Sequence, residues 1–72
     1  MNTEEKYLAD LGLKIKRLRE EKSLDQKAFA FFCDIGRTQL YKIETGQTNP
    51  RLLTLRKIAK GLNTTVGKLL EV

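Results

Sequence analysis

Histidine is absent from this chain of 72 residues, and cysteine occurs once, as Cys33. Without histidine, the chain lacks the usual ligand sets of a zinc site and the base that activates most serine and cysteine nucleophiles. Its glycines form no loop of the kind that cradles a phosphate. A single thiol cannot form a disulfide within the chain. We therefore expect no bound metal, no cofactor and no enzymatic activity.

Long apolar runs are also absent, so no segment is long enough to span a bilayer. The first residues, Met1 to Lys6, carry acids where a secretory signal would carry a basic run followed by an apolar one. The one proline, Pro50, lies in a short polar segment, and no linker or internal repeat occurs. These features predict a single domain over residues 1–72, in a reducing cytoplasm and without a membrane partner.

Acidic residues are too few to balance the basic ones. Fourteen lysines and arginines against nine aspartates and glutamates give a formal charge of +5 at pH 7. Such a surplus favours a polyanionic partner through long-range attraction. Charge alone does not identify that partner as nucleic acid, because many small basic proteins bind none. Whether the partner is nucleic acid has to be decided from the positions of individual residues.

Apolar residues recur at helical spacing in five segments of the chain. Asp25 and Thr65 can each accept a hydrogen bond from the turn that follows them, and Gly46 can end a helix in the left-handed conformation. The sequence thus predicts an all-α, compact domain of five helices, at about residues 4–22, 26–33, 37–45, 52–62 and 66–71.

The two short helices at 26–33 and 37–45, separated by a brief turn, form the pattern of a helix-turn-helix. The most specific residues lie in and around this pair: Leu24-Asp25-Gln26, Phe29-Ala30, Ile43-Glu44-Thr45-Gly46 and Asn49-Pro50. With these motifs at the family's separations, the chain from Leu11 to Leu70 resembles the phage repressor and Cro-like (XRE-type) helix-turn-helix family. The resemblance implies a lambda-repressor-like fold and a DNA-binding transcriptional regulator.

The helix at 37–45 is expected to enter the major groove, which is wide enough to admit it. Once Leu40 and Ile43 point into the core, the helix presents a polar face to solvent. Arginine and lysine there can bind guanine, and threonine can touch a thymine methyl group. The alternative is an ordinary solvated helix face. The candidate base-contacting residues are Arg37, Thr38 and Lys42, with Gln39 and Tyr41 as secondary candidates.

Contacts to the DNA backbone are expected on both sides of this helix. Gln26 opens the preceding helix, where amide groups and the helix dipole favour a phosphate, and the resemblance implies that this glutamine contacts the backbone. Thr48, Asn49 and Arg51 extend the footprint on the other side. The resemblance suggests that Arg51 reaches the minor groove, and a plain exposed arginine is the alternative.

The resemblance also implies a partly buried ion pair between Arg19 and Glu44 that fixes the recognition helix. A buried carboxylate needs such a partner, and the alternative is an exposed Glu44 that merely reduces repulsion with phosphate. Cys33 occupies a core position of the family and is expected to be an inert buried thiol. Asp34 stands where the turn usually has glycine, and Gly36 replaces the usual polar cap of the recognition helix.

Three apolar residues, Phe31, Phe32 and Leu53, occupy positions that are normally polar. We expect one phenylalanine to extend the core against the N-terminal segment near Tyr7, and a protein contact is the other interpretation. A homodimer on a palindromic operator is predicted, because one recognition helix reads too few base pairs to be selective. Its expected contacts are Leu53, Val66, Leu69 and Leu70.

Among short members of the resembled family we favour a restriction-modification controller protein over a Cro-like protein or an antitoxin. A different class of function stays open, in which an antitoxin or protein-interaction module binds another protein through its apolar patch. The partners expected from the sequence are double-stranded DNA, a second copy of the chain and, in the alternative, an unknown protein.

Overall fold

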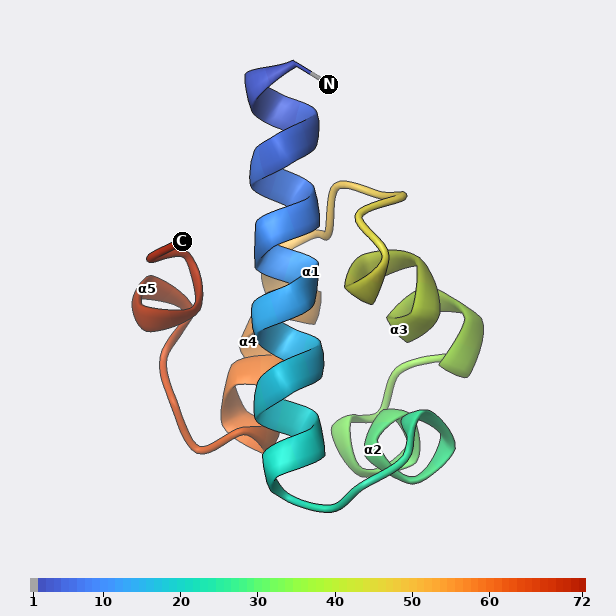
Figure 1. Cartoon of the computed structure of the whole chain (residues 1–72). Coiled ribbons are helices and arrows are strands. Elements are labelled where there is room, and N and C mark those ends of the chain that lie inside the picture. Colours follow the sequence, from blue (N-terminus) through green and yellow to red (C-terminus); the bar gives the residue numbers. More distant parts are fainter. Residues whose placement is uncertain (1) are drawn as a thin grey trace.

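A computed structural model describes residues 2–72 as five helices. The helices are α1 (Thr3–Glu21), α2 (Gln26–Cys33), α3 (Arg37–Glu44), α4 (Leu52–Gly61) and α5 (Val66–Leu69). The long α1 runs the length of the molecule, with α2 and α3 on one side, α5 on the other and α4 behind it (Figure 1). The predicted all-α, five-helix fold is confirmed. The last helix is shorter than the predicted range 66–71.

Polar side chains and left-handed residues set the helix ends. The carboxylate of Asp25 accepts a hydrogen bond from the amide of Ala28 at 2.7 Å, and the hydroxyl of Thr65 accepts one from Lys68 at 3.1 Å. Four residues with positive φ lie just after the ends of helices: Ser23, Asp34, Gly46 and Asn63. Asp34 ends α2 at φ 58° and ψ 47°, so it adopts the conformation that glycine would adopt at less cost.

Apolar residues from all five helices form one core. Its members are Leu11, Ile15, Phe29, Ala30, Cys33, Leu40, Ile43, Leu55, Ile58, Ala59, Leu62 and Leu69. Burial raises the pKa of the Cys33 thiol to about 11, so this thiol stays protonated at neutral pH. Cys33 is therefore a packing residue, as expected.

The two phenylalanines at the end of α2 do not enlarge this core. Phe31 is 88% exposed and Phe32 is 68% exposed, which overturns the expectation that one of them packs near the N-terminal segment. Tyr7 instead packs toward the other end of the chain, where its hydroxyl donates a hydrogen bond to the carbonyl of Leu70 at 2.6 Å. The alternative interpretation, an apolar surface patch, fits the structure.

Leu69 requires a second correction. It was expected to contact a second copy of the chain, but its side chain is fully buried within the core of one copy. The reason is that α5 packs against both α1 and α4, and Leu69 fills the space between them. Leu53 is 66% exposed, while Val66 and Leu70 are half-buried, so these three remain open to a partner.

The described helices include none that combines the length and the hydropathy needed to cross a membrane.

Candidate nucleic-acid interface

Helix α3 is held by α1 and α2 and shows its other side to solvent. Leu40, Ile43 and Glu44 are its buried residues. The exposed residues are Arg37, Thr38, Gln39, Tyr41 and Lys42, the five that the sequence selected as base-contacting candidates. The structure thus places all of these candidates on the outer side of one short helix.

A buried ion pair joins α3 to α1. The guanidinium of Arg19 donates to both carboxylate oxygens of Glu44, from Nε to Oε2 at 2.7 Å and from Nη2 to Oε1 at 3.0 Å. Its third nitrogen, Nη1, donates to the carbonyl of Leu24 at 2.7 Å. The hydrogen bond to Glu44 raises the pKa of Arg19 above its usual value. This bidentate geometry fixes both the position and the rotation of α3.

Gln26 belongs to the same network. Its Nε2 donates to Oε1 of Glu44 at 3.0 Å, and its side chain is half-buried. An amide nitrogen carries two hydrogens, so one donor remains after this bond. Sequence reasoning assigned Gln26 to phosphate alone and missed its contact with Glu44.

The start of α3 depends on Gln39. Gly36 has no side chain to cap the helix, and Oε1 of Gln39 accepts a hydrogen bond from the Gly36 amide at 3.4 Å. Nε2 of Gln39 donates to the hydroxyl of Thr54 in α4 at 3.3 Å. Gln39 therefore stabilises the beginning of α3, a role that its expected contact with bases did not include. Thr54, a buried polar residue, was also missed.

Two groups of polar residues flank α3. On one side Thr48, Asn49 and Arg51 line a hollow together with Gln39. On the other side Lys16 of α1 lines a hollow that also contains Gln26, Tyr41 and Glu44. The sequence did not identify Lys16 as part of this surface. The apolar stripe of α1 shows which residues face the core, but it does not show which exposed residues lie beside α3.

The cations of this surface are free of carboxylates. Within residues 2–72, Arg37, Lys42 and Arg51 form no ion pair, whereas four other cations do. Free arginine and lysine side chains can bind phosphate or the edge of guanine. The arrangement is therefore a rigid helix with polar and cationic side chains, flanked on both sides by further polar groups.

Residues 15–69 match the family described as Helix-turn-helix, and this match covers most of the chain. The protein belongs to the helix-turn-helix family and is a DNA-binding transcriptional regulator. Its sequence is 38% identical over 61 residues to the control protein C.BamHI of Bacillus amyloliquefaciens, covering 83% of this chain and 75% of that protein.

Two solved structures are similar to this fold. The restriction-modification controller protein C.AhdI from Aeromonas hydrophila matches with a TM-score of 0.82 and 31% identity, over 86% of this chain and 94% of that one. An HTH_3 family transcriptional regulator from Vibrio cholerae matches with a TM-score of 0.84 and 28% identity, over 93% of this chain and 38% of that one. The relatives are regulators rather than enzymes, as expected from the sequence.

Proposed function

We propose that this protein is a restriction-modification controller that acts in the cytoplasm as a homodimer on a palindromic operator. The observation that carries the proposal is the outer side of α3, where Arg37, Thr38 and Lys42 are exposed while Arg19 and Glu44 fix the helix from beneath. The similarity to C.BamHI and C.AhdI supports the controller role.

In the proposed complex α3 lies in the major groove. Arg37, in the first turn of α3, forms two hydrogen bonds with a guanine, Thr38 contacts a thymine methyl group, and Lys42 binds guanine or phosphate. Gln39 and Tyr41 are secondary base contacts. The flanking residues bind the backbone: Gln26 on one side, and Thr48, Asn49 and Arg51 on the other, with Arg51 reaching toward the minor groove.

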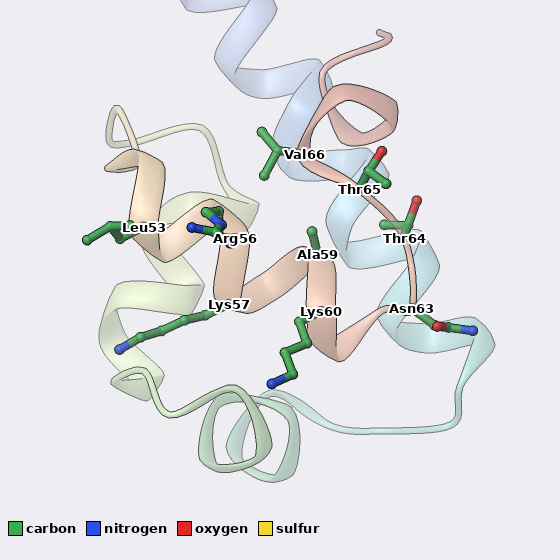
Figure 2. Close-up of a pocket in the computed structure, with 9 residues that line it drawn as sticks. All are labelled: Leu53, Arg56, Lys57, Ala59, Lys60, Asn63, Thr64, Thr65 and Val66. Carbon is green, nitrogen blue, oxygen red and sulfur yellow. The ribbon is translucent and has the colours of Figure 1, made fainter.

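The proposed dimer contact lies on α4 and the segment leading into α5. Figure 2 shows a hollow there whose lining includes Leu53, Ala59 and Val66. Leu53 is 66% exposed, and removing it from water in a dimer would be favourable. Leu70 is the third proposed contact. A two-fold dimer would present its recognition helices to half-sites about 34 Å apart.

Replacing Arg37 by alanine should relax base preference at one position of the operator and cost about 1–3 kcal/mol there, because a bidentate contact to guanine is lost. Selection from a random library of double-stranded DNA, followed by sequencing, measures this preference. Arg17→Ala is the matched control, because Arg17 lies beside the C-terminal residues Glu71 and Val72, away from α3. An unchanged preference in Arg37→Ala, or an equal change in the control, would contradict the proposed contact.

Replacing Leu53 by glutamate should shift the protein from dimer to monomer, because the substitution removes an apolar side chain from the proposed contact and would bury a carboxylate there. Sedimentation equilibrium gives the mass in solution. Leu13→Glu is the matched control, since Leu13 is 59% exposed on α1, outside the proposed contact. If the Leu53 variant keeps the mass of the unaltered protein, the proposed dimer contact is wrong.

A further inference from the structure

The two most exposed large apolar side chains of the described residues are neighbours in the sequence. Phe31 and Phe32 are 88% and 68% exposed, and we call them the aromatic patch. Single exposed apolar residues are common on protein surfaces, but each phenylalanine offers a large apolar area, and the two follow each other in the last turn of α2. The aromatic patch contributes nothing to the core, whose nearest members in sequence are Ala30 and Cys33.

The aromatic patch lies away from the DNA-binding contacts. It occupies the last turn of α2, whereas Gln26 occupies the first, and the rise of a helix separates Gln26 from Phe32 by about 9 Å. None of the hollows beside α3 that hold Gln26, Tyr41 or Arg51 includes either phenylalanine. The aromatic patch is therefore a second surface, separate from the proposed DNA contacts.

Lysines lie on α2 itself and on α4, the helix that packs against it. Lys27 lies one turn before Phe31 on α2. Helix α4 packs against α2, and Figure 2 shows Lys57 and Lys60 projecting from α4. Nζ of Lys57 lies 3.3 Å from the carbonyl oxygen of Asp34 and 3.7 Å from its carboxylate, at the end of α2. The two ends of α2 carry the acids Asp25 and Asp34, whereas α4 carries Arg56, Lys57 and Lys60 and no acid, so α2 and α4 together have a surplus of cations.

We propose that the aromatic patch is a docking site for an acidic amphipathic helix of another protein. Apolar side chains one turn apart on such a helix would cover the rings of Phe31 and Phe32, because buried aromatic residues are common anchors of protein interfaces. Carboxylates beside those side chains would face Lys27 and Lys60. This charge complementarity identifies the partner's chemistry.

Two other occupants fit the aromatic patch less well. A second copy is already proposed to bind at the hollow on α4 that includes Leu53 and Val66, and the lining of that hollow contains neither phenylalanine. An anionic membrane would match the lysines, but only one turn of α2 is apolar on its outer side, which is less than the continuous apolar face of a membrane-surface helix. A contact of this small size is compatible with weak, transient binding of a single protein helix.

Titration of the full chain with a synthetic peptide tests the proposal. The peptide is helical, carries leucine at positions i, i+3 and i+7, and has glutamate at most other positions. Fluorescence anisotropy should show that Phe31→Ser combined with Phe32→Ser weakens binding about tenfold or more, and that high salt weakens binding to the unaltered protein. Nuclear magnetic resonance should place the shifted amides in the second half of α2 and the facing side of α4.

Matched controls separate the aromatic patch from general stickiness. The double variant Leu13→Ser with Leu52→Ser removes two other exposed side chains, 59% and 64% exposed, and should bind the peptide unchanged. A peptide with lysine in place of every glutamate should bind far more weakly. Circular dichroism should show that the phenylalanine variant keeps its fold, and the variant should bind the operator as the unaltered protein does. A loss of peptide binding can then be distinguished from a loss of DNA binding.

Four results would overturn the proposal. The first is that the phenylalanine and control variants bind the peptide with equal affinity, and the second is that the unaltered protein binds the lysine peptide as tightly as the glutamate peptide. The third is that the protein binds vesicles that contain phosphatidylserine but does not bind the acidic peptide. The fourth is that the protein self-associates and that Phe31→Ser with Phe32→Ser abolishes this self-association. The third result would assign the aromatic patch to lipid, and the fourth would assign it to a second copy of the chain.

Discussion

Replacing Glu44 by alanine should cost about 3–5 kcal/mol of unfolding free energy, because the guanidinium of Arg19 would stay buried without its carboxylate. Arg19 and Glu44 are only 5% and 2% exposed, and three hydrogen bonds end on the Glu44 carboxylate. At about 0.05–0.15 kcal/mol per residue, a chain of 72 residues is stable by about 4–11 kcal/mol in total. The variant should therefore be partly unfolded at growth temperature, and urea denaturation measures the loss.

The exposed pair between Lys6 and Asp10 provides the control. Its side chains are 70% and 39% exposed, so Asp10→Ala should cost less than about 1 kcal/mol. Replacing both members of the buried pair, as in Arg19→Met with Glu44→Leu, should recover much of the lost stability, because no unpaired charge is then left in the core. The buried pair would lose its proposed importance if Glu44→Ala cost no more than Asp10→Ala.

The same pair connects stability with recognition. Glu44 is the last residue of α3, and its carboxylate binds Arg19 of α1 and Gln26 of α2. The three helices meet at this group, so the direction in which Arg37 and Lys42 point depends on it. A loss of Glu44 should accordingly weaken specific DNA binding even where the protein remains folded.

Local chemistry explains why much of the fold could be predicted. The caps Asp25 and Thr65 act on amides three residues away, and the apolar positions Leu40 and Ile43 follow from the helical period. The residues of α3 that do not belong to its apolar stripe then form the exposed side of the helix. These features depend on neighbours within one or two turns, which the sequence shows directly.

Features that depend on distant neighbours could not be predicted in the same way. The apolar residues of α5 and its end look alike in the sequence, so the sequence does not distinguish the buried Leu69 from the half-buried Val66 and Leu70. Only the packing of α5 against α1 and α4 shows that Leu69 belongs to the core. The exposure of Phe31 and Phe32 depends on whether another helix covers the last turn of α2. The capping contact of Gln39 and the position of Lys16 beside Gln26 also arise from the arrangement of separate elements.

Gly12 is the clearest case of such a distant dependence, since nothing in its sequence surroundings marks it. It is buried in α1 where this helix crosses the end of α3. A Cβ at this position would collide with the backbone carbonyl oxygen of Ile43 and would lie 2.6 Å from that of Glu44. Backbone atoms of a packed helix cannot turn aside as a flexible side chain can, so α1 and α3 would have to separate.

Gly12→Ala should therefore destabilise the protein by about 3 kcal/mol, the upper part of the range for overpacking, although alanine favours a helix by about 1 kcal/mol over glycine. Separation of α1 from α3 would also stretch the contact between Arg19 and Glu44. Specific operator binding should consequently fall at temperatures where circular dichroism still reports a folded chain.

Gly67→Ala is the matched control, since a Cβ there would meet only Oγ1 of Thr65, at 3.9 Å. That substitution should stabilise the protein by about 0.4–1 kcal/mol through the unfolded state. Thermal unfolding of both variants is the measurement. If Gly12→Ala raised the melting temperature as Gly67→Ala is expected to do, α1 and α3 would not be in the close contact that holds the recognition helix in place.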